Sequence, residues 1–279
     1  LPIIPPTAER VELMVAGSGQ PADTVVAAID PIRGIATVEK IAINAVMAGC
    51  KPEYMPVLVA AVQAMTQPRF CLHGVQCTTN PVAPAVIVNG PIRHRLAMNT
   101  SHGLMGPGNR ANATIGRAIR LLLRNIGGAY IGVDQSTHGS PAKYTLCFGE
   151  REEESPWEPL SVGEGLAPNQ DAVTVVAVES LLSTTAVYWN ANAIMFMLAK
   201  AARAGGTSSF FSTGSPAFVL CPGHARILAD AGYDRKKIRE EIFERAKLPM
   251  SAFPPEGNIP MGKWILDGDR VLICERPED

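Results

Sequence analysis

The spacing of hydrophobic residues predicts helices over the first quarter of the chain. Three segments carry this signal, and each is opened by a capping residue or a proline: Ala8–Ala16, Thr37–Ala48 and Pro52–Met65. Within the second segment the apolar residues recur at three- and four-residue spacing, which is the pattern of a helix with one buried face. These residues are Val38, Ile41, Ala45 and Ala48. Residues 1–69 are therefore predicted to be helical.

Beyond residue 69 the pattern changes to short apolar runs between turn residues, which is typical of strands that alternate with helices. The predicted strands are Phe70–Thr79, Val86–Asn89, Tyr130–Val133, Tyr144–Phe148, Asp171–Glu179, Ala217–Cys221, Trp264–Leu266 and Val271–Cys274. The predicted helices are Ala111–Asn125, Asn192–Arg203, Gly223–Ala231 and Asp234–Ala246. This alternation predicts an α/β fold with a mixed sheet and flanking helices.

The order of the elements predicts two halves. Residues 1–156 hold the helical segment and a first α/β half, and residues 157–170 form a loop or linker rich in Pro, Gly and Ser. Residues 171–279 form a second α/β half. The two strand-then-helix units share an order of elements but little sequence, so no duplication is inferred.

Composition narrows the class of protein. Of the 279 residues, 47% are hydrophobic and 18% are charged, which favours a folded core over intrinsic disorder. The net charge is −1, without the basic excess of a nucleic-acid binder, and no apolar run approaches the roughly 20 residues that span a bilayer. The six cysteines include no CxxC pair, and the first residues show no secretory signal. Free thiols and a cytoplasmic location are therefore predicted.

The strongest candidate for chemistry is the loop that opens the predicted helix Ala111–Asn125, with the sequence Gly106-Pro107-Gly108-Asn109-Arg110-Ala111-Asn112. Its glycines allow close approach of the backbone, and free N–H groups at a helix start favour an anion. Asn109, Arg110 and Asn112 add side-chain donors. The alternative is helix capping by Asn109 or Asn112. The loop lacks the GK[ST] ending of a phosphate loop and the dinucleotide fingerprint, so no cofactor is predicted.

A second candidate is the run Cys71-Leu72-His73-Gly74-Val75-Gln76-Cys77. On an ideal strand Cys71, His73 and Cys77 share a face, where two thiolates and an imidazole suit zinc or copper. A strand packed with small cysteines is the commoner arrangement, so no metal is predicted. Cys77, at the end of the predicted strand, is the candidate thiol nucleophile.

Two histidines are candidates for general acid–base catalysis, because an imidazole titrates near neutrality. His102 lies in the loop after Asn99, and His138 lies in a glycine-containing turn. Each could equally be a loop histidine bonded to backbone. In the acidic run after residue 149, Glu150 is the residue considered for the site. The residues predicted to bind substrate are polar residues and glycines of these segments: Thr78, Asn80, Asn89, Gly106, Gly108, Asn109, Arg110, Asn112 and Lys143.

Three strings of the chain resemble a known family: the run from Thr37 to Cys50, the run Asn89-Gly90-Pro91-Ile92 and the run from Gly106 to Arg117. They resemble the module associated with the UGSC-type (seleno)proteins of bacteria, from Pro5 to about Pro156 and more loosely to Pro249. The family is named for a redox Sec/Cys-Gly-Ser-Cys motif, which implies thiol chemistry. This chain contains no UGSC or CGSC string, so that chemistry is carried onto no residue here. Either a companion chain supplies the motif, or this branch does different chemistry.

These observations predict an enzyme or enzyme subunit that acts on a small polar or anionic substrate. Cys77 would be the nucleophile, and His102 or His138 would move protons. Two alternatives stay open: a noncatalytic partner subunit of a heteromeric enzyme, and a metal-dependent hydrolase or lyase that uses Cys71, His73 and Cys77. The apolar content, which includes 10 Met, predicts a homo- or hetero-oligomer. No nucleic-acid or membrane partner is expected.

Overall fold

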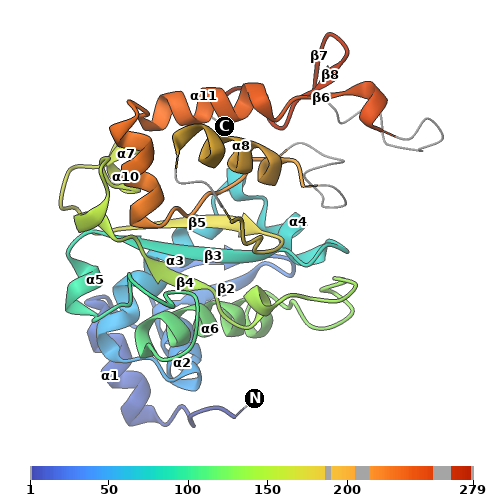
Figure 1. Cartoon of the computed structure of the whole chain (residues 1–279). Helices are drawn as coiled ribbons and strands as arrows, with labels where there is room; N and C mark the ends of the chain where they lie inside the picture. The colour runs from blue at the N-terminus through green and yellow to red at the C-terminus, as the bar shows by residue number, and fades with distance from the viewer. Residues whose placement is uncertain (1, 186–189, 205–213, 254–264, 278–279) are drawn as a thin grey trace. The chain divides into compact units, whose positions relative to one another are not determined.

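The computed structural model describes residues 2–185, 190–204, 214–253 and 265–277. The chain divides into two units (Figure 1): Leu1–Glu152 with Glu158–Leu181, and Glu153–Trp157 with Leu182–Asp279. No helix among the described residues is long and apolar enough to cross a membrane.

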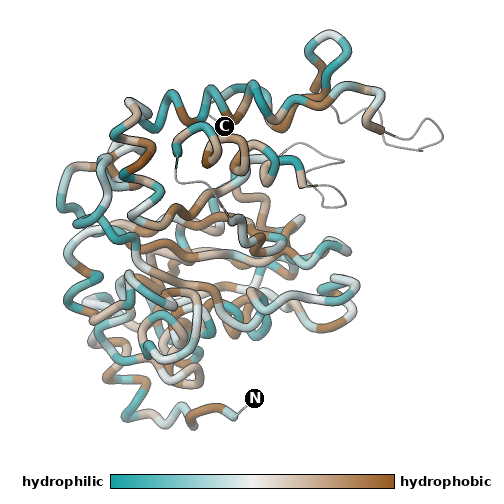
Figure 2. Tube along the Cα trace, in the orientation of Figure 1, coloured by the Kyte–Doolittle hydropathy of each residue, from teal (hydrophilic) through white to brown (hydrophobic). Residues whose placement is uncertain are grey.

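The central sheet of the first unit has the strand order β4-β3-β5, formed by Cys147–Gly149, Ala83–Asn89 and Ala172–Val178. β4 runs parallel to β3 and β5 runs antiparallel to it, so the predicted mixed sheet is confirmed. Side chains alternate along β3: Val86 and Val88 enter the main core, whereas Ala85 joins a smaller cluster with Phe148. Hydrophobic residues follow these strands in Figure 2.

Four helices pack into the main core with Val86 and Val88: α1 (Ala8–Ser18), α2 (Val38–Ala48), α3 (Met55–Met65) and α6 (Arg110–Asn125). The predicted start of α2 is confirmed, since Thr37 Oγ1 accepts a hydrogen bond from Lys40 N at 3.3 Å. The apolar face predicted for this helix is buried. The first unit also contains shorter elements: η1 (Pro52–Tyr54), η2 (Pro68–Phe70), α4 (Leu72–Cys77), α5 (Ile92–Arg95), η3 (Pro141–Lys143) and α7 (Leu160–Gly163). The residues of η4 (Glu152–Glu154) are divided between the two units.

The predicted helical character of residues 1–69 is wrong over one stretch. Val25–Ile29 (β1) and Gly34–Thr37 (β2) form an antiparallel two-stranded sheet. Both strands are short and carry Val, Ile and Thr, which suit strands, and Asp30 and Pro31 suit the turn between them.

Two predicted strands of the first unit are also absent. Phe70–Thr79 contains the end of η2 and the helix α4, in which the buried residues Leu72, Val75 and Gln76 have helical spacing. Tyr130–Val133 is a tight turn with a single bridge between Ile131 and Asp134. In both segments the run of Val, Ile, Leu or Cys indicated burial or β-propensity, but no strand among the described residues pairs with it.

The second unit packs α8 (Ala191–Ala202), α10 (Pro222–Asp230) and α11 (Arg235–Arg245) around a core of its own. A small antiparallel sheet has the order β6-β8-β7, from Leu248–Pro249, Arg270–Val271 and Leu266–Asp267, and η5 (Met250–Ala252) follows β6. β7 and β8 form the predicted hairpin around Gly268. Trp264 lies outside the described residues.

Two predictions that concern the second half need correction. Ala217–Cys221 has no regular structure, and Cys221 instead directly precedes α10. β5 was expected to open the second half, but it pairs with β3 in the first unit. The first unit therefore extends to Leu181 and includes β5.

Candidate functional site

The structure gathers five of the predicted site residues around the start of β3. Cys77, Thr78 and Asn80 precede this strand, and the segment that carries His138 and Lys143 is bonded alongside them. Thr137 N donates to Thr79 O at 2.9 Å, and Ser140 Oγ donates to Pro81 O at 3.2 Å. Figure 1 shows α4, which ends at Cys77, and α5, which follows Asn89, at opposite ends of the strand.

Asn89 ends β3, six residues and about 20 Å from its start. It is fully buried in a charged cluster, where its Nδ2 donates to Glu150 Oε2 at 2.6 Å and to Glu152 Oε1 at 2.8 Å. Arg93 is also buried and pairs with Glu152 at 2.8 Å. These bonds tie the end of β3 to the segment after β4. Asn89 is thereby separated from Cys77, and a substrate-binding role for it stays a prediction.

The loop before α6 is held by hydrogen bonds of its own side chains. Asn109 Oδ1 caps the helix by accepting from Asn112 N at 3.0 Å, and Arg110 Nε donates to Gly49 O at 3.0 Å. Asn112 is buried and bonds to Asn99 N, Asn99 O and Leu104 O at 2.9–3.1 Å. The capping alternative is therefore observed for Asn109, whereas an anion at this loop stays a prediction.

The remaining predicted residues of that loop are exposed: His102, Gly106 and Gly108. His102 Nδ1 lies 3.2 Å from Ser101 Oγ. Gly108 has a φ of 109°, which favours glycine, and a side chain there would meet open space. No described hydrogen bond joins this loop to the segment of Cys77, so the predicted combination of Cys77 with the Gly106–Asn112 loop in one site gains no support.

Asn112→Ala is expected to lower the free energy of unfolding by about 2 kcal/mol, because it removes three hydrogen bonds and leaves partly buried backbone groups of Asn99 and Leu104 without these partners. Asn109→Ala is the matched control and should cost about 1 kcal/mol as an ordinary loss of a helix cap. Urea denaturation measures both values. If Asn112→Ala lowers the free energy of unfolding no more than Asn109→Ala does, the hydrogen bonds of Asn112 are not the main ones that hold the loop.

The helix α4 changes the interpretation of the cysteine-rich run. Cys77 is its last residue and half-buried, so the positive end of the helix dipole does not face this thiol. Cys71, His73 and Cys77 no longer share a face through strand alternation. Among the described residues no three His, Cys, Asp or Glu side chains gather closely enough to hold a metal ion.

Two other cysteines of the first unit are unsuited to nucleophilic chemistry. Burial raises the pKa of Cys50 to about 12, and burial also raises the pKa of Cys147. A neutral thiol is a poor nucleophile. The exposed Cys71 and the half-buried Cys77, at the two ends of α4, are the accessible thiols of this unit.

A buried ion cluster lies beside the Cys77 segment. The carboxylate of Asp134 accepts from Lys143 Nζ at 2.9 Å through both oxygens and from Arg120 Nη2 at 2.6 Å. Ser136 adds its Oγ at 2.8 Å and its backbone N at 3.2 Å. We call these four residues the Asp134 cluster. Lys143 was predicted from the sequence, whereas Arg120 was not, because it lies one helix turn from Arg117 and carries no separate signal.

The Asp134 cluster carries an excess of positive charge. Two cations share one carboxylate, and Nη1 of Arg120 is buried without a partner among the described residues. Burial raises the pKa of Asp134, but the hydrogen bonds from Lys143 and Ser136 outweigh that effect and bring its pKa below the ordinary value. Asp134 is therefore ionised at neutral pH, and one positive charge is left over.

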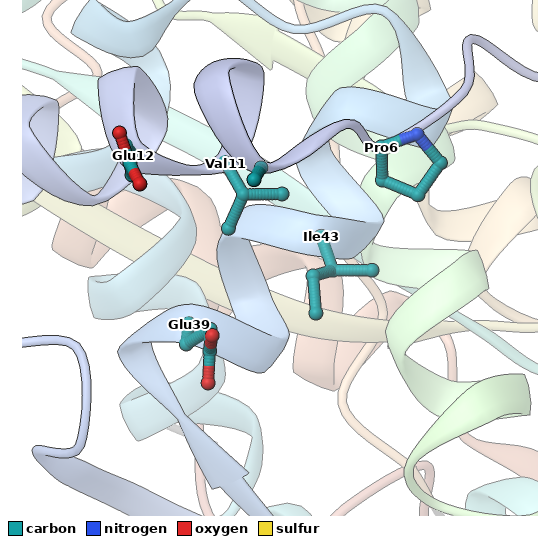
Figure 3. Close-up of a pocket in the computed structure, with 6 residues that line it drawn as sticks. Pro6, Val11, Glu12, Glu39 and Ile43 are labelled. Carbon is teal, nitrogen blue, oxygen red and sulfur yellow. The ribbon is translucent and has the colours of Figure 1, made fainter.

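A separate groove lies between α1 and α2 and encloses about 330 Å³ (Figure 3). Pro6, Val11 and Ile43 form its apolar part, and Glu12 and Glu39 supply two carboxylates. No predicted site residue lines it, so it is distinct from the candidate site.

Comparison with known proteins returned no match to a family model, to a curated protein or to a solved structure. The resemblance to the UGSC-type proteins, which three strings of the sequence carry, therefore stays a prediction.

Proposed function

We propose that the chain is an enzyme, or a subunit of one, that binds a small anionic molecule at the Asp134 cluster and acts on it through the thiol of Cys77. The observation that carries this proposal is the excess positive charge of the cluster, together with the buried Nη1 of Arg120. A buried guanidinium donor without an acceptor is costly. Carboxylate and phosphate oxygens are the acceptors that arginine binds most strongly.

The neighbouring segments supply further groups for such a ligand. Thr78 and Asn80 offer a hydroxyl and an amide close to Cys77 in the chain. His138 Nδ1 donates to Gly139 O at 2.8 Å, which leaves Nε2 of a neutral ring to accept a proton. In the proposed arrangement Arg120 and Lys143 hold the anionic group, and Cys77 Sγ forms a bond to an electrophilic carbon of the same molecule. The bond from that carbon to its leaving group breaks, the leaving group departs with the electron pair, and His138 takes the thiol proton. Arg120 and Lys143 thus take the role that the sequence suggested for Arg110.

Two alkylating agents of similar size test the proposal without a known substrate. Iodoacetate is an anion and iodoacetamide is neutral, and both form a thioether with loss of iodide. We expect the ratio of the iodoacetate rate to the iodoacetamide rate to be about three- to fivefold higher at Cys77 than at Cys71, the effect of roughly 1 kcal/mol of attraction. Peptide mass spectrometry resolves the two thiols within one sample. Inorganic phosphate should lower the Cys77 rate with iodoacetate.

Arg120→Gln should reduce the ratio at Cys77 to that at Cys71. Arg117→Gln, on the same helix but outside the Asp134 cluster, is the matched control and should leave the ratio unchanged. Circular dichroism confirms that both variants fold. Equal ratios at the two thiols of the folded wild-type chain would overturn the anion site and favour the noncatalytic-subunit alternative.

A further inference from the structure

A tight turn after α6 displays three exposed hydrophobic side chains. Tyr130, Ile131 and Val133 are 48%, 103% and 38% exposed. Tyr130 O closes the turn by accepting from Val133 N at 3.0 Å and from Asp134 N at 2.8 Å. The turn is followed directly by Asp134, whose buried side chain is ion-paired. The turn is therefore anchored at that end. We call Tyr130, Ile131 and Val133 the apolar tip.

The tip also carries a cation. Arg124, exposed in the last turn of α6, lies with its guanidinium 5.5 Å from the centre of the Tyr130 ring. Among the described residues it pairs with no carboxylate. A fully exposed isoleucine beside a tyrosine and an arginine has the composition of a binding hot spot. Gathered exposed apolar side chains of this kind mark interaction surfaces.

The groove between α1 and α2 has the complementary chemistry. Val11 and Ile43 converge on its floor, and Glu12 and Glu39 both lie toward the end away from Pro6 (Figure 3). Both glutamates are exposed, and neither has an ion-pair partner in the described part of the chain. A hydrophobic side chain flanked by a cation would therefore match the groove in both polarity and charge.

We propose that the groove of one copy of this chain receives the apolar tip of a second copy, with Ile131 against Val11 and Ile43 and with Arg124 facing Glu12 and Glu39. Tip and groove belong to different elements of the first unit, and the proposed contact is head-to-tail, with the tip of each copy in the groove of the next. Each pair of copies then keeps one free tip and one free groove, so association continues until a ring closes or as an open filament. None of these residues enters the proposed catalytic function, which could fail without affecting this inference.

Analytical ultracentrifugation of the full chain tests the inference. The wild-type chain should form species of several chains. Ile131→Glu should raise the dissociation constant by about 30-fold or more, because it puts a carboxylate into an acidic groove. Leu166→Glu makes a similar change at a 40% exposed site outside tip and groove and should leave association unchanged. A single-chain mass at every concentration, or association insensitive to Ile131→Glu, would overturn the proposal.

Charge reversal tests the groove itself. The double change Glu12→Lys with Glu39→Lys should abolish association, and adding Arg124→Glu to the same chain should restore it. Mixing an Ile131→Ser chain, whose tip gains no charge, with the Glu12→Lys, Glu39→Lys chain should give a species of two chains and no more, since one intact groove meets one intact tip. If the groove changes leave association intact while Ile131→Glu abolishes it, the tip binds another surface and the groove assignment is wrong.

Discussion

Asp134→Asn is expected to lower the free energy of unfolding by about 3–5 kcal/mol. The side chains of Asp134 and Lys143 are only 7% and 9% exposed, and Arg120 shares the same carboxylate. Asparagine keeps the size of the side chain but removes the charge, so two largely buried cations lose their counter-ion. Removing one member of a buried ion cluster costs far more than the whole cluster contributes. Urea denaturation followed by circular dichroism measures the change.

Asp30→Asn is the matched control within the same unit. Asp30 pairs with Arg33 at 3.7 Å, but the arginine side chain is 73% exposed. Exposed pairs contribute little, so this change should cost about 1 kcal/mol or less. Similar costs at Asp30 and Asp134 would contradict the description of the Asp134 cluster as a buried network.

The cluster also predicts a pH dependence of stability. The pKa of Asp134 in the folded chain lies below its ordinary value of 3.8. A carboxyl whose folded pKa is depressed contributes stability that is complete above its unfolded pKa and is lost as the pH falls through the folded pKa. The wild-type chain should therefore lose stability below about pH 4, and Asp134→Asn should lose less over the same interval. If the free energies of unfolding of the two proteins fall equally as the pH is lowered, Asp134 does not make this contribution.

The parts of the fold that could be predicted from sequence are those with a local cause. Thr37 and Asn109 cap helices with their own side chains, and the apolar spacing that follows each cap predicts the buried face. β3 is apolar from Ala83 to Val88 because it is the middle strand, with one face in the main core and the other in the smaller cluster. For these elements a window of about ten residues contains the whole signal.

The segments that were wrongly predicted depend on distant partners. Phe70–Thr79 has the residue types of a strand, yet no strand in the described part of the chain pairs with it, and its buried positions have helical spacing. The β1–β2 pair lies between helices, and its short runs of Val, Ile and Thr give a weak local signal. Strand pairing over long separations decides such cases, and one sequence does not contain that information.

The candidate site, too, depends on contacts between segments that are distant in the sequence. Lys143 and His138 stood out because they share one polar turn, but nothing in that turn indicates that Thr137 bonds to Thr79, 58 residues earlier. The placement of Asp134 against Arg120 likewise depends on how the segment after α6 folds back on the helix. Residue types therefore indicated which segments carry chemistry, and only the fold could show which of them meet.

Arg93→Met is the second change expected to cost about 3–5 kcal/mol of unfolding free energy. The Arg93 side chain is 3% exposed, pairs with Glu152 at 2.8 Å and donates from Nε to Gly90 O at 2.9 Å. It also donates to Glu150 O. Methionine fills much of the same volume without charge, so the Glu152 carboxylate, 15% exposed beside Asn89, is left without its cation.

Arg95→Met, two residues further along α5, is the control for this change. Arg95 pairs with Asp171, but its side chain is 58% exposed, and the expected cost is about 1 kcal/mol or less. Adding Glu152→Gln to Arg93→Met should recover part of the loss, because the unpaired charge is then removed, and the two changes should not be additive. Urea denaturation of the wild type, Arg93→Met, Glu152→Gln and the double variant gives the coupling energy directly. If Arg93→Met costs no more than Arg95→Met, or if Glu152→Gln recovers nothing, the end of β3 is held by its backbone and the charged cluster contributes little to it.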